Sequence, residues 1–309
     1  MEIERHTEDE MLHMDLLGGQ VRVMLCETTQ MVQRARDIHE ASPVATAAMG
    51  RLMTATAMLG VMMKGEKESV TVTVKGDGPM GTLVAVADHG DVRVTADDPQ
   101  VELPPRADGK LDVGGAVGHN GRMSVVKDLG MREHYIGQIE LVSGELGIDF
   151  ANYFTVSEQQ PSLVSLGVLV KGTEVIKAGG LLLQPLPGCS EETLEQLELR
   201  SPMFAEISRE LNAAPKEELA EGWFRGMDLR LLDRSPLAYR CTCSRTRMEK
   251  ALLAIGRQDL QSIIDDRQGA ELGCHFCRKT YQFTTEELEA LLASATPQKE
   301  SREEEEEHV

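Results

Sequence analysis

Four cysteines near the C-terminal end are the strongest constraint on how this chain can fold. Cys241 and Cys243 form a C-x-C pair within YRCTCSRTR, and Cys274 and Cys277 form a C-x-x-C pair within LGCHFCRKTY. Two close pairs of thiolates are a typical ligand set for a tetrahedral zinc ion. The sequence therefore predicts one zinc ion per chain, bound by these four residues.

The same pattern argues against metal catalysis. A catalytic zinc keeps one position open, whereas four cysteines fill all four positions. His275 is awkwardly placed to replace its neighbour Cys274 and is not assigned as a ligand, and Cys26 and Cys189 are interpreted as ordinary small apolar residues. We therefore assign no catalytic residue. Basic residues beside the two pairs suit the negative charge of four thiolates: Arg240, Arg245, Arg247, Arg278 and Lys279.

Residues 1–188 have the pattern of an α+β core domain. The stretch 28–64 predicts helices, with Ser42 as a cap before Pro43 at the first helical position. A further helix is predicted in GELGIDFANYFTVSEQQ. Strands joined by turns are predicted in SVTVTVK, TLVAVAD, HGDVRV, RMSVVKD, HYIGQIELV, SLVSLGVLV and TEVIKAGGLLLQPL.

A glycine pattern in this region invites a different interpretation. Gly76, Gly78 and Gly81 match the spacing of a dinucleotide-binding loop. Such a loop must open a helix whose N-terminal amides face the phosphates, but here a strand pattern follows. We therefore interpret the glycines as a hairpin connection.

Residues 189–236 predict a charged helical linker of low stability. Pro202, Pro215 and Pro236 interrupt the segment, and its apolar residues are sparse. Short helices are marginal in water unless they dock against something else. We expect this linker to stay folded only while another part of the molecule holds it.

Residues 237–295 predict a small zinc-binding α+β domain, followed by an acidic tail at 296–309 that we expect to be disordered. Two helices are predicted between the cysteine pairs, the first beginning at Ser244, and Thr284 with Glu287 forms a possible capping box before a last helix. A core of this size rarely contributes more than ~3–5 kcal/mol, whereas structural zinc contributes roughly 10–16 kcal/mol. Loss of the metal through oxidation of its ligands is therefore expected to unfold the domain.

Composition limits the partners. The net charge is −19, from 51 acidic and 32 basic residues, which opposes binding to phosphate backbones. The N-terminus lacks the pattern of a signal peptide, and we expect no membrane-spanning run in the first two-thirds of the chain. We expect a cytoplasmic protein with reduced thiols and with neither nucleic acid nor membrane as a partner.

Several stretches resemble, in order, the bacterial redox-regulated holdases of the 33 kDa heat-shock chaperonin family. The most specific are YRCTCSRTRMEKALLAIGRQDLQSII and CHFCRKTYQF. SPVATAAMGRLMTATAML, YFTVSEQQPS and AGGLLLQPLPG support them, and the resemblance extends from about Met11 to Leu292. Arg93 lacks the Gly-Tyr that commonly follows it in the family, so no role is transferred to it.

This resemblance implies a non-enzymatic chaperone controlled by oxidation. The reduced, zinc-bound form would be an inactive monomer. Oxidants together with unfolding stress would form the disulfides Cys241–Cys243 and Cys274–Cys277, release zinc and unfold the linker. The resulting homodimer would bind unfolding client proteins without ATP and prevent their aggregation.

Two other functions remain open from the residues alone. A thiol-disulfide oxidoreductase would use Cys274 and Cys277, but it would place them at a helix N-terminus rather than among strand-like residues. A zinc ribbon that binds another protein would keep its zinc permanently as a structural ion. Metal release distinguishes the ribbon from the redox-controlled chaperone, because a ribbon would lose its activity with the metal and a redox switch would gain activity.

Overall fold

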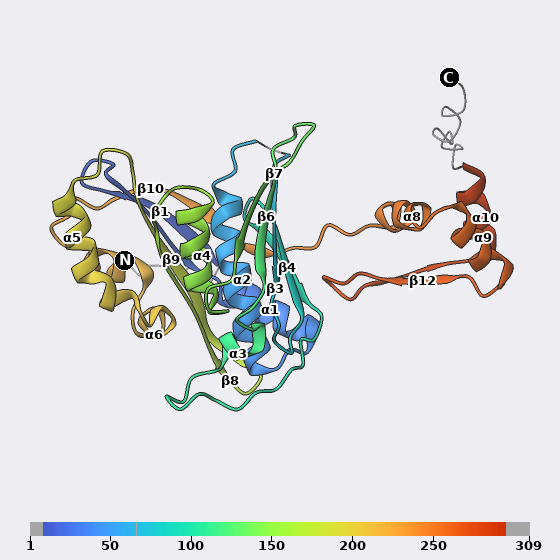
Figure 1. Cartoon of the computed structure of the whole chain (residues 1–309), viewed down its shortest axis with the longest axis horizontal. Coiled ribbons are helices and arrows are strands. Elements are labelled where there is room, and N and C mark those ends of the chain that lie inside the picture. The colour runs from blue at the N-terminus through green and yellow to red at the C-terminus, as the bar shows by residue number, and fades with distance from the viewer. Residues whose placement is uncertain (1–8, 66, 295–309) are drawn as a thin grey trace, which may run out of the picture. The chain divides into compact units, whose positions relative to one another are not determined.

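The computed structural model describes residues 9–65 and 67–294 (Figure 1). The chain divides into two compact units, one ending at Cys241 and the other beginning at Thr242. Helices and antiparallel strands occur in both units, so the predicted α+β class is confirmed. The predicted disorder of 296–309 concerns residues outside the described ranges.

The first unit contains a five-stranded antiparallel sheet. Its order is β10-β1-β2-β9-β8, formed by β1 (Glu10–Leu16), β2 (Val21–Glu27), β8 (Leu163–Lys171), β9 (Glu174–Pro185) and β10 (Arg230–Pro236). Strands β1, β2 and β9 contribute buried side chains to both faces. Leu12, Leu25 and Leu181 are cross-strand neighbours on one face, while Met24 and Leu182 are neighbours on the other. Apolar residues at adjacent positions of a strand therefore face two different cores.

A second, six-stranded sheet has one face toward the core. Its order is β11-β5-β4-β3-β6-β7, formed by β3 (Ser69–Lys75), β4 (Thr82–Asp88), β5 (Asp91–Ala96), β6 (Arg122–Asp128), β7 (Tyr135–Glu140) and β11 (Ala238–Tyr239). In β3, every second residue is buried, as the strict alternation of SVTVTVK predicts. The glycine-rich stretch does connect β3 to β4, and a Cβ on Gly78 would lie 2.4 Å from the Ala116 carbonyl oxygen. The hairpin interpretation is confirmed, because β3 and β4 pair in antiparallel fashion on either side of this stretch. Gly78 allows the connection to pack closely against residue 116.

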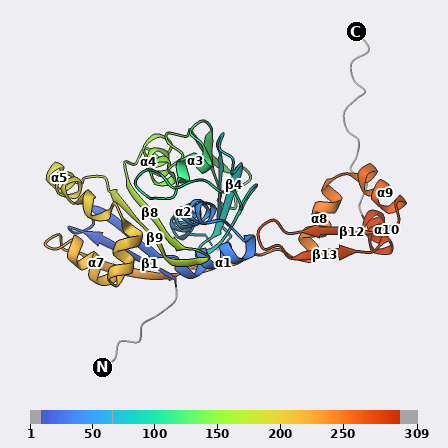
Figure 2. The ribbon, with the colours of Figure 1, turned by 90° about the horizontal axis from the view of Figure 1, so that it is seen from below.

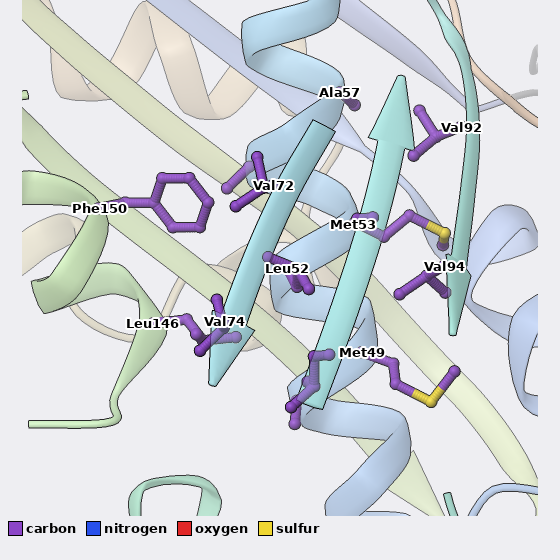
Figure 3. Close-up of a cluster of buried hydrophobic side chains, with 14 of the residues drawn as sticks. Met49, Leu52, Met53, Ala57, Val72, Val74, Val92, Val94, Leu146 and Phe150 are labelled. Carbon is purple, nitrogen blue, oxygen red and sulfur yellow. The ribbon is translucent and has the colours of Figure 1, made fainter. Parts of the chain in front are cut away.

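Helices fill the space between the two sheets, and α2 is seen nearly end-on there in Figure 2. They are α1 (Thr29–His39), α2 (Pro43–Val61), α3 (Val113–Val117) and α4 (Leu146–Val156). The Ser42 hydroxyl accepts a hydrogen bond from the Ala45 amide at 3.2 Å, which confirms the predicted cap. Figure 3 shows Leu52 and Met53 of α2 among side chains of the neighbouring strands and of α4.

Burial of α2 is more complete than a single apolar face would give. All but one of the residues from Val44 to Gly60 are buried, because sheets lie on two sides of the helix. The helix is also long and apolar enough to cross a bilayer by length and composition, contrary to our expectation that this part of the chain holds no such run. Since 89% of its apolar window is buried in the protein, it is a core helix.

Residues 189–236, expected to be a separate helical linker, belong to the first unit. Helices form over part of the segment, as α5 (Glu191–Arg200), the 3-10 turn η1 (Ser201–Phe204), α6 (Ile207–Ala213) and α7 (Lys216–Trp223). The helical prediction is wrong for Arg230–Pro236, which form β10 against β1. This strand supplies the backbone hydrogen bonds that one edge of β1 would otherwise lack.

Eight apolar side chains of the linker are buried where the linker meets the sheet. One buried cluster has 16 side chains, half of them from β1, β2 and β9 and half from the linker. The linker members are Leu197, Phe204, Ile207, Leu211, Ala220, Trp223, Phe224 and Met227. The element that holds the predicted low-stability segment is therefore this face of the five-stranded sheet.

Two glycines let the linker approach the sheet closely. Gly167 of β8 and Gly179 of β9 are cross-strand partners. A Cβ on Gly167 would lie 2.7 Å from Ile207 Cγ2, and one on Gly179 would lie 2.4 Å from Leu211 Cδ1. Only a residue without a side chain permits α6 to pack at this distance.

The second unit is small. It contains α8 (Arg245–Ala254), α9 (Arg257–Asp265), the hairpin of β12 (Ala270–Gly273) and β13 (Thr280–Phe283), and α10 (Thr285–Ser294). The predicted capping box is confirmed, since the Thr284 amide donates to Glu287 Oε2 at 2.9 Å and the Glu287 amide donates to Thr284 Oγ1 at 3.3 Å. Its buried apolar cluster has seven side chains: Leu252, Leu260, Ile264, Tyr281, Phe283, Leu288 and Leu292.

The start of this unit differs from the predicted boundary at residue 237. Leu237 packs in the core of the first unit, and β11 pairs with β5 in parallel. The segment from Leu237 to Cys241 therefore belongs to the first unit by its contacts. The division of the chain falls between Cys241 and Cys243, inside the C-x-C pair.

Candidate metal centre

The structure brings the four predicted cysteines together. The sulfur atoms of Cys241, Cys243, Cys274 and Cys277 all lie within 4.8 Å of one another, and the sulfurs of Cys243 and Cys277 are 3.4 Å apart. A tetrahedral ion with zinc–sulfur bonds of about 2.3 Å would hold its ligands about 3.8 Å apart. The cluster therefore has the donor chemistry and the size to hold one metal ion.

A tight chain reversal positions the C-x-x-C pair between β12 and β13. The Arg278 amide donates to the Cys274 carbonyl at 2.8 Å, and the Cys274 amide donates to the Lys279 carbonyl at 2.9 Å. Arg278 adopts a left-handed backbone conformation with φ 59°, which closes the turn. His275 is exposed in this turn. The pair thus lies in a hairpin turn and not at a helix N-terminus, the position from which an oxidoreductase thiol gains its reactivity.

A tyrosine that sequence reasoning missed lies against the C-x-C pair. The Tyr281 hydroxyl is 3.2 Å from Cys243 Sγ, and this hydrogen bond raises the pKa of Tyr281 to about 12. The hydroxyl therefore stays protonated at neutral pH and can donate to the sulfur. The available signal was the alternation in β13, where Tyr281 and Phe283 are buried and their neighbours Thr280 and Gln282 are exposed.

Flanking basic residues are partly engaged elsewhere. Arg245 forms an ion pair with Glu287 at 2.7 Å, and its guanidinium lies 4.3 Å from the centre of the Phe283 ring. Arg240 forms an ion pair with Asp91 at 3.1 Å. These contacts attach the chain on either side of Cys241 and Cys243, so the arginines have structural roles besides balancing thiolate charge.

The other two cysteines are not members of the cluster. Cys26 is fully buried in β2, and burial raises the pKa of its thiol to about 12. Cys189 is half-buried before α5, and loss of solvent likewise raises the pKa of its thiol. Neither environment favours a reactive thiolate, which is consistent with their interpretation as ordinary apolar residues.

Comparison with known proteins adds a family context. Residues 9–284 match the family model described as Hsp33 protein. The chain is 44% identical over 278 residues to a 33 kDa chaperonin of Alkaliphilus metalliredigens, covering 89% of this chain and 95% of the relative. It is 45% identical over 267 residues to one of Caldanaerobacter subterraneus, covering 85% and 91%. The crystal structure of the 33 kDa chaperonin of Thermotoga maritima superposes with a TM-score of 0.85 at 33% identity, covering 93% of this chain and 98% of that one.

Proposed function

The chain belongs to the Hsp33 family of chaperones, and from that premise we propose that it is a redox-regulated holdase that binds unfolding proteins without ATP. In this proposal the protein acts in the cytoplasm, where its thiols are reduced until an oxidant appears. Its role is binding, and no group in the proposal performs catalysis. The observation that carries the proposal is the convergence of four thiols, three of them in a unit whose apolar cluster has only seven buried side chains.

Cys241, Cys243, Cys274 and Cys277 are the proposed ligands of one zinc ion in the reduced protein. Four thiolates suit zinc by their softness, and the spacing of the sulfurs suits a tetrahedral site. The ion, when bound, would stabilise the second unit as a structural cross-link. Because ion binding of this kind is worth roughly 10–16 kcal/mol in small zinc modules, the folding of the unit would depend on it.

Oxidation would remove the ligands in pairs. Two neighbouring thiolates would give two electrons to peroxide and form one S–S bond, while the peroxide and two protons from the solvent become two water molecules. We propose the pairs Cys241–Cys243 and Cys274–Cys277, as the family resemblance implies. Sulfur in a disulfide is no longer a thiolate ligand, so the pairs would release the metal and the second unit would unfold.

The linker at 189–236 would be the element that turns unfolding into activity. It covers one face of the five-stranded sheet with eight buried side chains, and its short helices have little stability of their own. Undocking would expose apolar surface on the sheet and on the linker. We propose that this surface binds client proteins and that the active form is a homodimer, whereas the reduced form is a monomer.

One experiment tests the proposal against a permanent zinc ribbon. Zinc content, thiol content and suppression of client aggregation are measured before and after peroxide with mild heating. The proposal expects release of about one zinc per chain, loss of four thiols and a gain of anti-aggregation activity. A ribbon would lose function when zinc leaves, and that result would overturn the proposal. Cys189→Ser is the matched control and should keep the parent's zinc content.

A further inference from the structure

A buried ammonium group lies where the linker meets the sheet. Lys216 is the first residue of α7, and its side chain is only 7% exposed. It is the one lysine or arginine among the buried residues of the described chain. A desolvated ammonium is strongly unfavourable unless a carboxylate partner compensates for the lost water.

The position of Lys216 in its helix does not explain the burial. A positive charge at a helix N-terminus opposes the helix dipole, so Lys216 does not favour α7 by itself. Its Nζ lies 3.0 Å from Glu10 Oε1 and 4.0 Å from Glu217 Oε1. The nearer partner is the first residue of β1, which belongs to the sheet and not to the linker.

Glu10 also joins a second cation. Arg234 of β10 places Nη1 2.6 Å from Glu10 Oε1 and 2.7 Å from Glu217 Oε1. The Glu10 side chain is 18% exposed, so its carboxylate has also lost much of its water. A single carboxylate oxygen of the sheet thus contacts cations from α7 and from β10, before and after the turn that ends the linker helices.

We propose that Lys216, Glu10, Glu217 and Arg234 form an ion-pair clasp that holds the linker on the sheet independently of the metal centre. Opening the clasp would undock α7 while the four thiols still hold their metal. The reason is that removal of one member leaves a charge in a site with little water. Two other ion pairs join the linker to the rest of the first unit, Lys110 with Glu206 and Arg230 with Asp15. The Lys110 and Arg230 side chains are 47% and 51% exposed, so both pairs are expected to contribute little.

Trp223 gives a direct readout of the clasp. It is the only tryptophan of the chain, it ends α7, and it is buried with ring centres 5.3 Å from Phe204 and 6.5 Å from Phe224. Undocking would move its indole from an apolar site into water and shift its emission to longer wavelength. Hydrogen exchange of α7 amides reports the same event, and exchange in α2 reports whether the rest of the unit stays folded.

The test uses the reduced, zinc-loaded full-length protein and four variants. Glu10→Gln removes the carboxylate charge, Lys216→Met removes the ammonium, the double variant removes both, and Glu206→Gln is the exposed control. We expect Glu10→Gln to speed amide exchange in α7 by at least about tenfold, with zinc content and α2 exchange unchanged. The double variant should return to within about threefold of the parent, because no uncompensated charge is left.

Several results would overturn the clasp. They are unchanged α7 exchange in Glu10→Gln, an equal effect in Glu206→Gln, exchange in α2 that rises together with α7, or a double variant as open as Glu10→Gln. The link to chaperone activity rests on the proposed function, which makes Glu10→Gln active without an oxidant. If that variant undocks the linker but does not bind clients, the clasp stands and the proposed function fails.

Discussion

The two units of this chain are stabilised in different ways. The first contains two sheets with helices between them, and its main apolar cluster has 45 buried side chains in the part of the chain that the structure describes. The apolar cluster of the second has seven buried side chains, and three of the four clustered thiols belong to this unit. Apolar burial alone can stabilise the first unit, whereas the second is of a size that usually requires a metal or disulfides.

Under the proposed function, this difference gives the two units separate roles. A unit stabilised by one ion can be unfolded by a chemical change at four sulfur atoms, while a large core responds little to the same chemistry. The linker lies between these extremes, because its eight buried side chains depend on a sheet that belongs to the stable unit. A switch of this kind needs a unit that unfolds, a unit that stays folded and a segment that stays folded only while it packs against the stable unit.

Removal of the metal should produce the largest difference between the two units. A chelator under reducing conditions is expected to abolish amide protection from residue 242 to 294, since roughly 10–16 kcal/mol of ion binding would be lost. Protection in α2 should remain. Hydrogen exchange read by mass spectrometry checks both regions in one sample. A second unit that stays protected without metal would show that its core suffices.

The linker should be the next most sensitive region. Phe204 is fully buried against Trp223 and Phe224, so Phe204→Ala is expected to weaken linker docking by about 3–5 kcal/mol. Trp223 emission in a urea titration measures the effect, with zinc content unchanged. Leu199→Ala lies on the same linker at a side chain 81% exposed and should change stability by less than about 0.5 kcal/mol. Equal effects of the two variants would mean that the linker is not docked as described.

A pH effect on stability is expected at a buried carboxyl of the first unit. Burial raises the pKa of Asp9 from 3.8 to about 6, although its carboxylate accepts hydrogen bonds from the Gln30 and Met31 amides at 3.0 and 2.6 Å. A carboxyl whose pKa is raised by folding stabilises the protein below its unfolded-state pKa and loses that contribution as pH rises through the folded-state pKa. Between pH 4 and 7 the loss should be on the order of 2 kcal/mol.

The Asp9 effect is measured as a difference between variants, because many other groups titrate in the same range. The unfolding free energy of the parent minus that of Asp9→Asn should fall as pH rises from 4 to 7. A difference that is constant across this range would show that the buried carboxyl does not titrate there.

Equivalent helix caps should give the smallest difference between the two units. Ser42→Ala in the first unit and Thr284→Ala in the second each remove a side-chain cap and should cost about 1 kcal/mol. The same loss shifts the melting temperature of a small unit more, by about 4–8 °C against about 2–4 °C for a large one. Calorimetry of the zinc-loaded variants measures both shifts, and a larger shift for Ser42→Ala would contradict the difference in size.

Local patterns predicted much of this architecture. Strict alternation predicted β3, the Ser42 and Thr284 caps were visible as short motifs, and cysteine spacing predicted that four thiols would converge. These features depend on residues close together in the chain. The same kind of signal placed the glycine-rich stretch in a hairpin.

Other features depend on contacts far apart in the sequence and were missed. The strand β10 forms because it pairs with the edge of β1, more than 200 positions earlier in the chain. Most residues of β10 are exposed, so the segment has no apolar alternation that would predict a strand. The sparse apolar residues of the linker suggested little burial, yet eight of them pack on one face of the five-stranded sheet, which Gly167 and Gly179 allow the linker to approach closely. Tyr281 became informative only once the hairpin placed it against Cys243.

Hydrogen exchange of the peroxide-treated protein tests the coupling of the two units most directly. The treated, zinc-free chain is compared with the reduced, zinc-loaded chain over α2, the linker helices and residues 242–294. The account predicts that protection disappears from the C-terminal residues and from α5 to α7 together, while α2 keeps its protection. Linker helices that stay protected after the C-terminal residues have unfolded would contradict it.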